Sequence, residues 1–268
     1  MKILHVITHL DARTGGGYAE RLFQMAHALQ RSGIENYILS TDYFLTKERM
    51  NEFFPINLVI LKSIVPRFFI PRIPFGRLYR LVDSVDVIHL MGHWSFLNIV
   101  IYLYAMHMGK PYICSPAGAL KIFGRSKILK IIFNIAFGNR IINNASANIA
   151  VGENETEDYM KYGYPPEKVY LMPNGINEEN YVDSDFNEFR EKFGIGSGPY
   201  ILFLGRLNLI KGPDLLLEAF EKISRKYSEL QLVFAGPDEN MLSSLKEYSV
   251  SHDLESRVHF IGFLAGRL

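Results

Sequence analysis

The chain has 268 residues, 48% of them hydrophobic, and a net charge of +1. This length allows one large domain or two small ones, and the apolar content is sufficient for a packed core. The single cysteine excludes an internal disulfide framework, and no apolar run approaches the length of a membrane-spanning helix. We therefore expect a cytoplasmic protein, either soluble or peripheral to the inner face of the membrane.

The positive charge is concentrated in one part of the chain. The segment from Phe53 to Gly152 contains eleven basic residues, and its only acids are Asp83 and Asp86. It carries +9, which leaves −8 for the remainder. Such a surface attracts anions. It is either a solvated face or a patch that meets an anionic membrane or a lipid-diphosphate acceptor, and no accompanying motif favours nucleic acid. The bases are Lys62, Arg67, Arg72, Arg77, Arg80, Lys110, Lys121, Arg125, Lys127, Lys130 and Arg140.

The N-terminal residues predict a strand, a glycine-rich turn and a helix. Lys2 to Thr8 has the pattern of a first strand and not of a signal peptide, and a helix is expected from Tyr18 to Arg31. Gly15, Gly16 and Gly17 lie between them, where they either let a ligand approach the backbone or give a flexible turn. A dinucleotide fingerprint fails here, because its third glycine would fall at Glu20.

Further strands and one notable helix are expected in the first domain. The strands are expected at Tyr37 to Ser40, Ile56 to Lys62, Asp86 to Leu90, Pro111 to Cys114, Asn148 to Val151 and Val169 to Met172. The helix is expected from Ser126 to Ile142. Its wide apolar face predicts packing in the core, with membrane contact as the alternative.

His93, just after the strand Asp86 to Leu90, is a candidate catalytic residue. A histidine titrates near neutral pH and can orient or bind an acceptor hydroxyl group. Its neighbour Trp94 is equally consistent with a packing role, so both interpretations remain open.

A polar segment connects the first predicted domain to the second. Pro173-Asn174-Gly175 predicts a sharp turn, and residues 173–198 form a linker with a short helix around Phe186 to Phe193. Strands and helices then alternate as β-α-β-α-β, which predicts part of a Rossmann-like domain. They are expected at Tyr200 to Leu204, Pro213 to Tyr227, Leu230 to Ala235, Glu239 to Ser251 and Val258 to Ile261.

The turn after the strand Tyr200 to Leu204 carries the main site signal. From Gly205 to Phe220 the sequence reads GRLNLIKGPDLLLEAF. Arg206 and Lys211 flank the turn, close to the N-terminus of the following helix. Ligands collect at the carboxyl ends of parallel strands and helix N-termini favour phosphate, so this pair suits two adjacent phosphates. Taken alone, the pattern fits two solvated loop cations equally well.

This segment resembles the glycine-arginine and lysine-glycine block of the retaining glycosyltransferases called group 1 or family 4. That family has two Rossmann-like domains in the GT-B architecture. Further blocks match in the expected order, namely Gly15-Gly16-Gly17, Pro173-Asn174-Gly175 and Ala235-Gly236-Pro237. The resemblance extends from Ile3 to Gly266.

The resemblance implies roles for individual residues. Arg206 and Lys211 would hold the diphosphate of a nucleoside diphosphate sugar, and Asn174 and Gly175 would lie beside the cleft. The other residues implied at the diphosphate are Gly16, Gly17, Gly205, Gly236 and Pro237. The family usually has a histidine two residues after the one at His89, where this chain has Met91, which makes His93 the substitute candidate. No metal and no cofactor besides the donor is implied.

The expected fold is α/β and GT-B-like. A complete N-terminal Rossmann-like domain at 1–172 is followed by the linker at 173–198 and an incomplete C-terminal Rossmann-like domain at 199–268. Family members continue further and carry a pair of glutamates that contact the donor. We therefore expect a C-terminally truncated chain with weak donor binding and reduced or no activity, whose open sheet edge favours self-association.

Three classes of function remain. The first is a glycosyltransferase that moves a sugar from a nucleoside diphosphate sugar to a saccharide or lipid-linked acceptor with retention, in cell-surface polysaccharide or glycan synthesis. The second is a non-catalytic remnant that binds a nucleotide sugar or a membrane. The third is a nucleotide-sugar epimerase of the same architecture. The resemblance favours the first, and the sequence does not identify the base, the sugar or the acceptor.

Overall fold

A computed structural model describes residues 1–65, 68–122, 126–177 and 186–264; for residues 12–14 and 186 it describes the backbone alone. Arg67, Arg125 and part of the predicted linker, residues 178–185, lie outside the described residues. The chain divides into two compact units, Met1–Asn177 (unit 1) and Glu178–Leu268 (unit 2), and each is described by itself.

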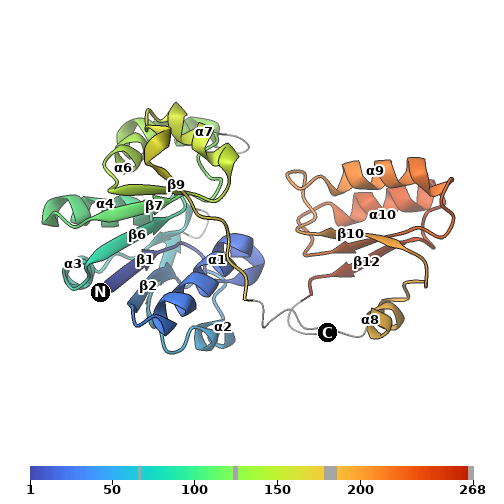
Figure 1. Cartoon of the computed structure of the whole chain (residues 1–268), viewed down its shortest axis with the longest axis horizontal. Coiled ribbons are helices and arrows are strands. Elements are labelled where there is room, and N and C mark those ends of the chain that lie inside the picture. Colours follow the sequence, from blue (N-terminus) through green and yellow to red (C-terminus); the bar gives the residue numbers. More distant parts are fainter. Residues whose placement is uncertain (66–67, 123–125, 178–185, 265–268) are drawn as a thin grey trace. The chain divides into compact units, whose positions relative to one another are not determined.

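Unit 1 is built on a sheet of seven parallel strands in the order β3-β2-β1-β6-β7-β8-β9 (Figure 1). The order reverses between β1 and β6. In sheets of this kind such a reversal marks the edge where ligands bind. The strands are β1 (Lys2–Val6), β2 (Glu35–Thr41), β3 (Asn57–Leu61), β6 (Val87–Met91), β7 (Tyr112–Ser115), β8 (Ala147–Ala150) and β9 (Val169–Leu171), and β4 (Ser63–Val65) pairs with β5 (Ile70–Pro71) in a separate antiparallel ribbon.

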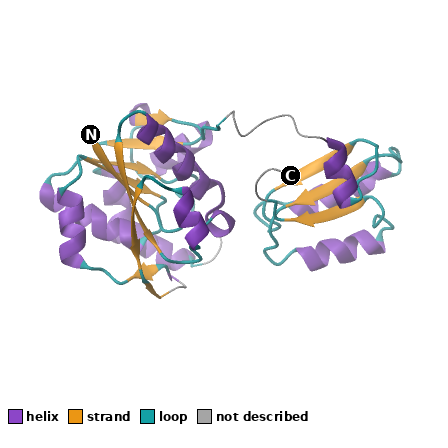
Figure 2. Ribbon diagram, turned by 90° about the horizontal axis from the view of Figure 1, so that it is seen from below, coloured by secondary structure: helices purple, strands orange, loops and turns teal. Residues whose placement is uncertain are grey.

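Helices lie on both sides of the sheet of unit 1 (Figure 2). They are α1 (Ala12–Arg31), α2 (Lys47–Glu52), α3 (Phe75–Asp83), α4 (Phe96–Met108), α5 (Lys127–Phe133), the π-helical turn η2 (Asn134–Gly138), α6 (Asn139–Asn143), α7 (Glu153–Lys161) and the 3₁₀ turn η3 (Pro166–Lys168). Consecutive side chains of β1 serve opposite faces: Leu4 and Val6 belong to a core with α3, α4 and α6, while His5 faces Asn36. A second core packs α1 on the sheet through Leu22.

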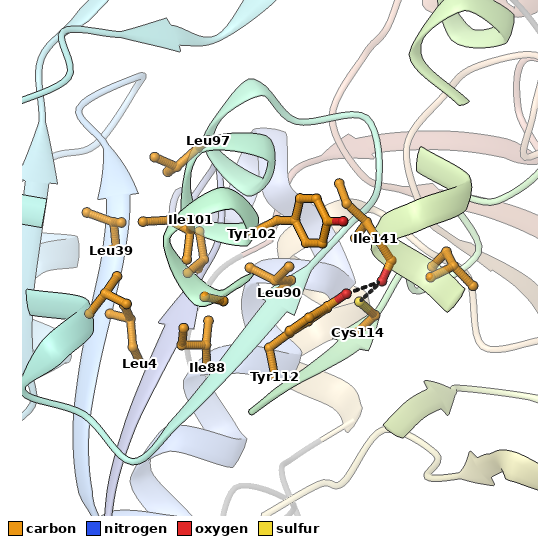
Figure 3. Close-up of a cluster of buried hydrophobic side chains, with 14 of the residues drawn as sticks. Leu4, Leu39, Ile88, Leu90, Leu97, Ile101, Tyr102, Tyr112, Cys114 and Ile141 are labelled. Carbon is orange, nitrogen blue, oxygen red and sulfur yellow. Dashed lines mark hydrogen bonds between the residues drawn. The ribbon is translucent and has the colours of Figure 1, made fainter. Parts of the chain in front are cut away.

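The larger core surrounds β6 and β7 (Figure 3). Leu90 and Ile101 are fully buried there. The hydroxyl of Tyr112 donates to the carbonyl oxygen of Ile141 at 2.8 Å, and the thiol of Cys114 donates to the same oxygen at 3.6 Å. Burial raises the pKa of the Cys114 thiol well above its ordinary value, so this cysteine is a packing residue.

The first helix begins earlier than the sequence predicts. Helix α1 starts at Ala12 and not at Tyr18, and it includes the three glycines. Gly16 breaks its regular geometry with φ 52° and ψ −143°. A run of glycines predicts a loop because glycine has low helix propensity, yet a helix can pass through such a run with a kink at one position.

The prediction that the helix from Ser126 to Ile142 packs in the core is wrong for its first half. The segment forms α5, η2 and α6 in succession, and α5 contains no buried residue. Ile128 is 74% exposed and Ile135 is 72% exposed. Burial begins at Asn134 and Gly138 and is complete for the apolar side chains of α6, Ile141 and Ile142.

Unit 2 is a parallel three-stranded sheet in the order β10-β11-β12. Its strands are β10 (Tyr200–Leu204), β11 (Gln231–Ala235) and β12 (Val258–Gly262), and its helices are α8 (Phe186–Phe193), α9 (Pro213–Ser224) and α10 (Leu242–Ser251). Helices α9 and α10 lie side by side on one face (Figure 1). Phe220 and Phe234 are buried in its core. The sequence YILFL predicts a buried strand, but β10 lies at the edge of the sheet and its Leu202 and Leu204 are exposed.

None of the helices that the structure describes combines the length and the apolar character needed to cross a membrane.

Candidate functional site

The predicted diphosphate residues of unit 2 meet where β10 and β11 end. The amide of Gly205 donates to the carbonyl oxygen of Ala235 at 2.9 Å, and the amide of Leu207 donates to that of Pro237 at 2.9 Å. The loops after two neighbouring parallel strands are thereby joined. Gly205, Arg206, Gly236 and Pro237 share one edge of the sheet, as ligand sites in α/β units do.

Gly236 lets these two loops come together. Its backbone has φ +150°, and its amide donates to Gly262 O at 2.8 Å. A Cβ atom at this position would overlap the carbonyl oxygen of Gly205. The glycine therefore serves the close approach of backbone to backbone.

Arg206 is held by an acid that sequence reasoning missed. Its guanidinium donates to Glu239 Oε1 at 2.8 Å, and Asn208 Nδ2 donates to Glu239 Oε2 at 2.6 Å. Burial alone would raise the pKa of Glu239, but the hydrogen bonds from Asn208 and Arg206 outweigh it and hold this pKa below its usual value. An anion that binds Arg206 must share the guanidinium with a carboxylate.

Lys211 lies at the start of α9. Gly212, with φ +64°, and Pro213 lead into the helix, and Asn208 Oδ1 accepts from the amide of Lys211 at 3.0 Å. The side chain of Lys211 is exposed, and no ion pair is found for it among the described residues. The helix N-terminus adds positive potential, while Asp214 contributes one negative charge to the same turn.

Gly16 and Gly17, the remaining predicted diphosphate residues, belong to unit 1. They lie in the interrupted first part of α1, which follows β1. A Cβ atom at either position would meet nothing within 4 Å. The space over this turn is therefore open, on the side of the sheet where the strand order reverses.

His93 is buried and hydrogen-bonded. It is 2% exposed, and its Nε2 lies 2.9 Å from Asn134 Oδ1. Asn134 Nδ2 in turn donates to the hydroxyl of Tyr162 at 2.7 Å, so Oδ1 is an acceptor and Nε2 of His93 carries the proton. Rings of Trp94 and Phe133 pack edge-on against the imidazole. These contacts describe a packing residue, and the catalytic assignment stays a prediction.

Asn174 and Gly175 lie against α1. Arg21 donates to Met172 O at 2.9 Å and to Asn174 Oδ1 at 2.7 Å. Gly175 lines a neighbouring cavity of about 300 Å³, together with residues of α1 such as Met25. Arg21 is 5% exposed and was not predicted; its position on the inner face of α1 gave no signal of a polar contact.

Metal ligands are not grouped in this chain as far as it is described. Within residues 1–65, 68–122, 126–177 and 186–264, no cluster of three or more His, Cys, Asp or Glu side chains could hold an ion.

The fold and these loops define a class of protein, and comparison with known proteins then gives the family. Two units of parallel sheet flanked by helices, with cationic residues where the strands end, are typical of GT-B glycosyltransferases. Residues 15–180 match the family described as Glycosyltransferase Family 4, and residues 185–267 match the one described as Glycosyl transferases group 1. The chain belongs to glycosyltransferase family 4, which makes it a transferase by family.

Two proteins of known name illustrate the range of similar sequences. A mannosylfructose-phosphate synthase of Agrobacterium fabrum is 32% identical over 114 residues, which are 39% of this chain and 25% of that protein. The gpi3 subunit of the phosphatidylinositol N-acetylglucosaminyltransferase of Schizosaccharomyces pombe is 23% identical over 257 residues, 92% of this chain and 53% of that subunit. The matches thus span about a quarter to a half of these two relatives.

A solved structure supports the fold. HepE of Anabaena in complex with UDP-glucose aligns with a TM-score of 0.75 at 17% identity, over 99% of this chain and 70% of that one. The expected α/β, GT-B-like fold is confirmed, with a large N-terminal and a small C-terminal sheet.

Proposed function

We propose that this protein transfers a sugar from a nucleoside diphosphate sugar to a saccharide or lipid-linked acceptor with retention at the anomeric carbon. The observation that carries the proposal is the joined pair of loops that presents Arg206 and Lys211 at the ends of β10 and β11. The UDP-glucose in the structure of HepE is consistent with such a donor.

The residues of unit 2 have a defined part in this chemistry. The bond between the anomeric carbon and the diphosphate oxygen breaks, and its electron pair stays on the diphosphate. The acceptor oxygen forms the new bond, and its proton passes to the departing diphosphate. Arg206, Lys211 and the first amides of α9 neutralise the charge that develops on the leaving diphosphate. Such stabilisation is commonly a large part of the catalytic effect.

We place the reaction in the cytoplasm, at the inner face of a membrane, in the synthesis of a cell-surface polysaccharide or glycan. The basic segment of unit 1 supports this location, because it suits a lipid-linked diphosphate or an anionic surface. His93 and the turn at Gly16 and Gly17 are our proposed contributions of unit 1, toward the acceptor and the donor respectively. Asn174 and Gly175 are proposed to border the cleft.

The experiment is calorimetry with a panel of nucleoside diphosphate sugars, followed by transfer assays. A charge-assisted hydrogen bond contributes about 1.5–3 kcal/mol, so Arg206→Ala should weaken donor binding about 10- to 150-fold. Lys211→Ala should weaken it about tenfold, since this lysine is exposed and screened. Lys222→Ala, at an exposed lysine in the last turn of α9, is the matched control and should bind as the wild type does.

The outcomes separate the alternatives. Binding of every donor by Arg206→Ala and Lys211→Ala at wild-type affinity would contradict the assigned site. A donor isomerised without any acceptor would identify an epimerase instead. Binding without transfer or hydrolysis would identify a non-catalytic nucleotide-sugar protein. The anomeric proton coupling of a product, measured by NMR, tests retention.

A further inference from the structure

The exposed side of the helix formed by α5 and η2 is aliphatic. Ile128, Ile131, Ile132 and Ile135 recur at positions i, i+3, i+4 and i+7, which places them in one stripe along the helix. All four are exposed, from 46% to 74%. The opposite side, through Asn134 and Gly138, is the buried one. We call these four isoleucines the isoleucine stripe.

Hollows border the isoleucine stripe on both sides. One is a groove of about 910 Å³ between α5 and the start of α4, lined mainly by Trp94, Phe96, Leu129 and Phe133. The other has a volume of about 680 Å³ and is lined by Ile122 among others. The second hollow has a mixed lining, in which Ile131 and Ile135 face polar side chains such as Lys121 and Asp158. The stripe is therefore a ridge between an apolar groove and a mixed hollow, a shape that exposes a contiguous apolar area.

The charge around this ridge is positive. The sequence contains no Asp or Glu from Val87 to Gly152, and Lys121, Lys127 and Lys130 lie on or next to α5. The ammonium of Lys130 lies 5.4 Å from the ring centre of Trp94, at the groove. The nearby Asp158 is engaged by two lysines, Lys121 at 3.7 Å and Lys161 at 2.9 Å.

We propose that the isoleucine stripe is a docking surface for a phospholipid bilayer with anionic headgroups. The four isoleucines enter the boundary between headgroups and acyl chains, and the lysines beside them meet the phosphates. Charge complementarity favours an anionic bilayer. Protein interfaces are enriched in aromatic residues, Met and Arg and depleted in Lys, whereas this ridge combines isoleucines with lysines.

This inference deepens the membrane location proposed above, yet it rests on residues of unit 1 and needs no donor. Vesicle binding measured without a nucleotide sugar therefore succeeds or fails independently of the transfer reaction.

The experiment is co-sedimentation of the whole chain with vesicles of phosphatidylcholine, with or without phosphatidylglycerol. Ile128→Ser combined with Ile132→Ser should weaken binding to anionic vesicles about tenfold or more. The matched control combines Leu103→Ser with Met106→Ser, two exposed apolar residues of α4, and should bind as the wild type does. Both pairs are at the surface, so circular dichroism should show an unchanged fold.

Two further measurements keep the proposal falsifiable. Ile132→Cys labelled with a polarity-sensitive dye should shift to the blue on anionic vesicles, and Cys114, which is 1% exposed, leaves the label specific. Raising the salt concentration should weaken binding. The proposal is overturned if the wild type does not bind anionic vesicles, if neutral vesicles bind equally well, or if the stripe variant loses self-association while it keeps vesicle binding.

Discussion

Acidification should destabilise unit 1 through three buried histidines, His5, His89 and His93. The Nδ1 atoms of His5 and His89 lie 3.1 Å apart, and His5 Nε2 lies 3.1 Å from Asn36 Oδ1. Asn36 donates through Nδ2 to two backbone carbonyls, so its Oδ1 is an acceptor and His5 Nε2 carries a proton. His89 Nδ1–H then donates to His5 Nδ1. This arrangement requires a neutral His5, and a proton on His89 Nε2 would be a buried charge with no hydrogen-bond partner among the described residues.

The magnitude follows from the pKa values. Burial lowers the pKa of His5 and of His93 to about 4, against the opposing effect of their asparagine partners. Burial, and then the charges of His5 and Arg21, lowers the pKa of His89 well below 6.5. From pH 6.5 down to about 4 the unfolded chain therefore binds protons that the native chain does not. Each histidine costs about 1.4 kcal/mol per pH unit over this range, and His5 and His93 together cost about 6 kcal/mol at pH 4.

This pH dependence has the opposite sign to that of a histidine whose charged form is stabilised by an acidic partner. The contribution of the neutral histidines to stability is fully present above the unfolded-state pKa of about 6.5, and it is lost as the pH falls toward 4. A loss of about 6 kcal/mol is comparable to the whole unfolding free energy of a typical domain. Unit 1 should therefore unfold in mild acid.

Urea denaturation at pH values from 7.5 to 4.5 measures this effect. Trp94, the only tryptophan of the chain, packs on His93, so its fluorescence follows the unfolding of unit 1. The free energy of unfolding should fall by about 4 kcal/mol per pH unit near pH 5.5, and His93→Gln should reduce this slope by about 1.4 kcal/mol per pH unit. Tyr162→Phe, in the same cluster, should lower the stability and leave the slope unchanged. Equal slopes for wild type and His93→Gln would refute the reasoning.

Two predictions concern unit 2. Gly236→Ala should destabilise this unit by about 1–3 kcal/mol, because residue 236 has a positive φ and its new Cβ atom would overlap the carbonyl oxygen of Gly205. Thermal unfolding followed by circular dichroism measures the loss. Gly262→Ala, at φ +76° with open space around it, measures the backbone strain without the overlap. Glu239→Gln should tighten donor binding about fivefold, because repulsion between a partly exposed carboxylate and the diphosphate weakens binding by about 1 kcal/mol. Weaker binding of the variant in calorimetry would instead mean that Glu239 orients Arg206.

Sequence reasoning located the strands well because their signal is local. The apolar run Tyr200–Leu204 was predicted with the bounds that β10 has, and β6 and β7 are each shifted by one residue. The resemblance implied that Arg206 and Gly236 belong to one site, and the structure has both in the loops after neighbouring parallel strands, at one edge of the sheet. The pairing of Arg206 with Glu239 did not follow, because the direction of a loop side chain depends on backbone contacts such as that of Gly236 with Gly205.

The helix from α5 to α6 shows a different limit. Its periodicity indicates that one side differs from the other, but the pattern does not state which side faces the protein. The buried side of η2 carries the polar residue Asn134, which forms hydrogen bonds with His93 and Tyr162. These two bonds offset the cost of removing its amide group from water. The apolar isoleucine stripe is left on the outside. Aliphatic area of this extent is unfavourable in water, whereas the basic charge around it is well solvated. The stripe, more than the charge, is therefore the feature of unit 1 that calls for a partner.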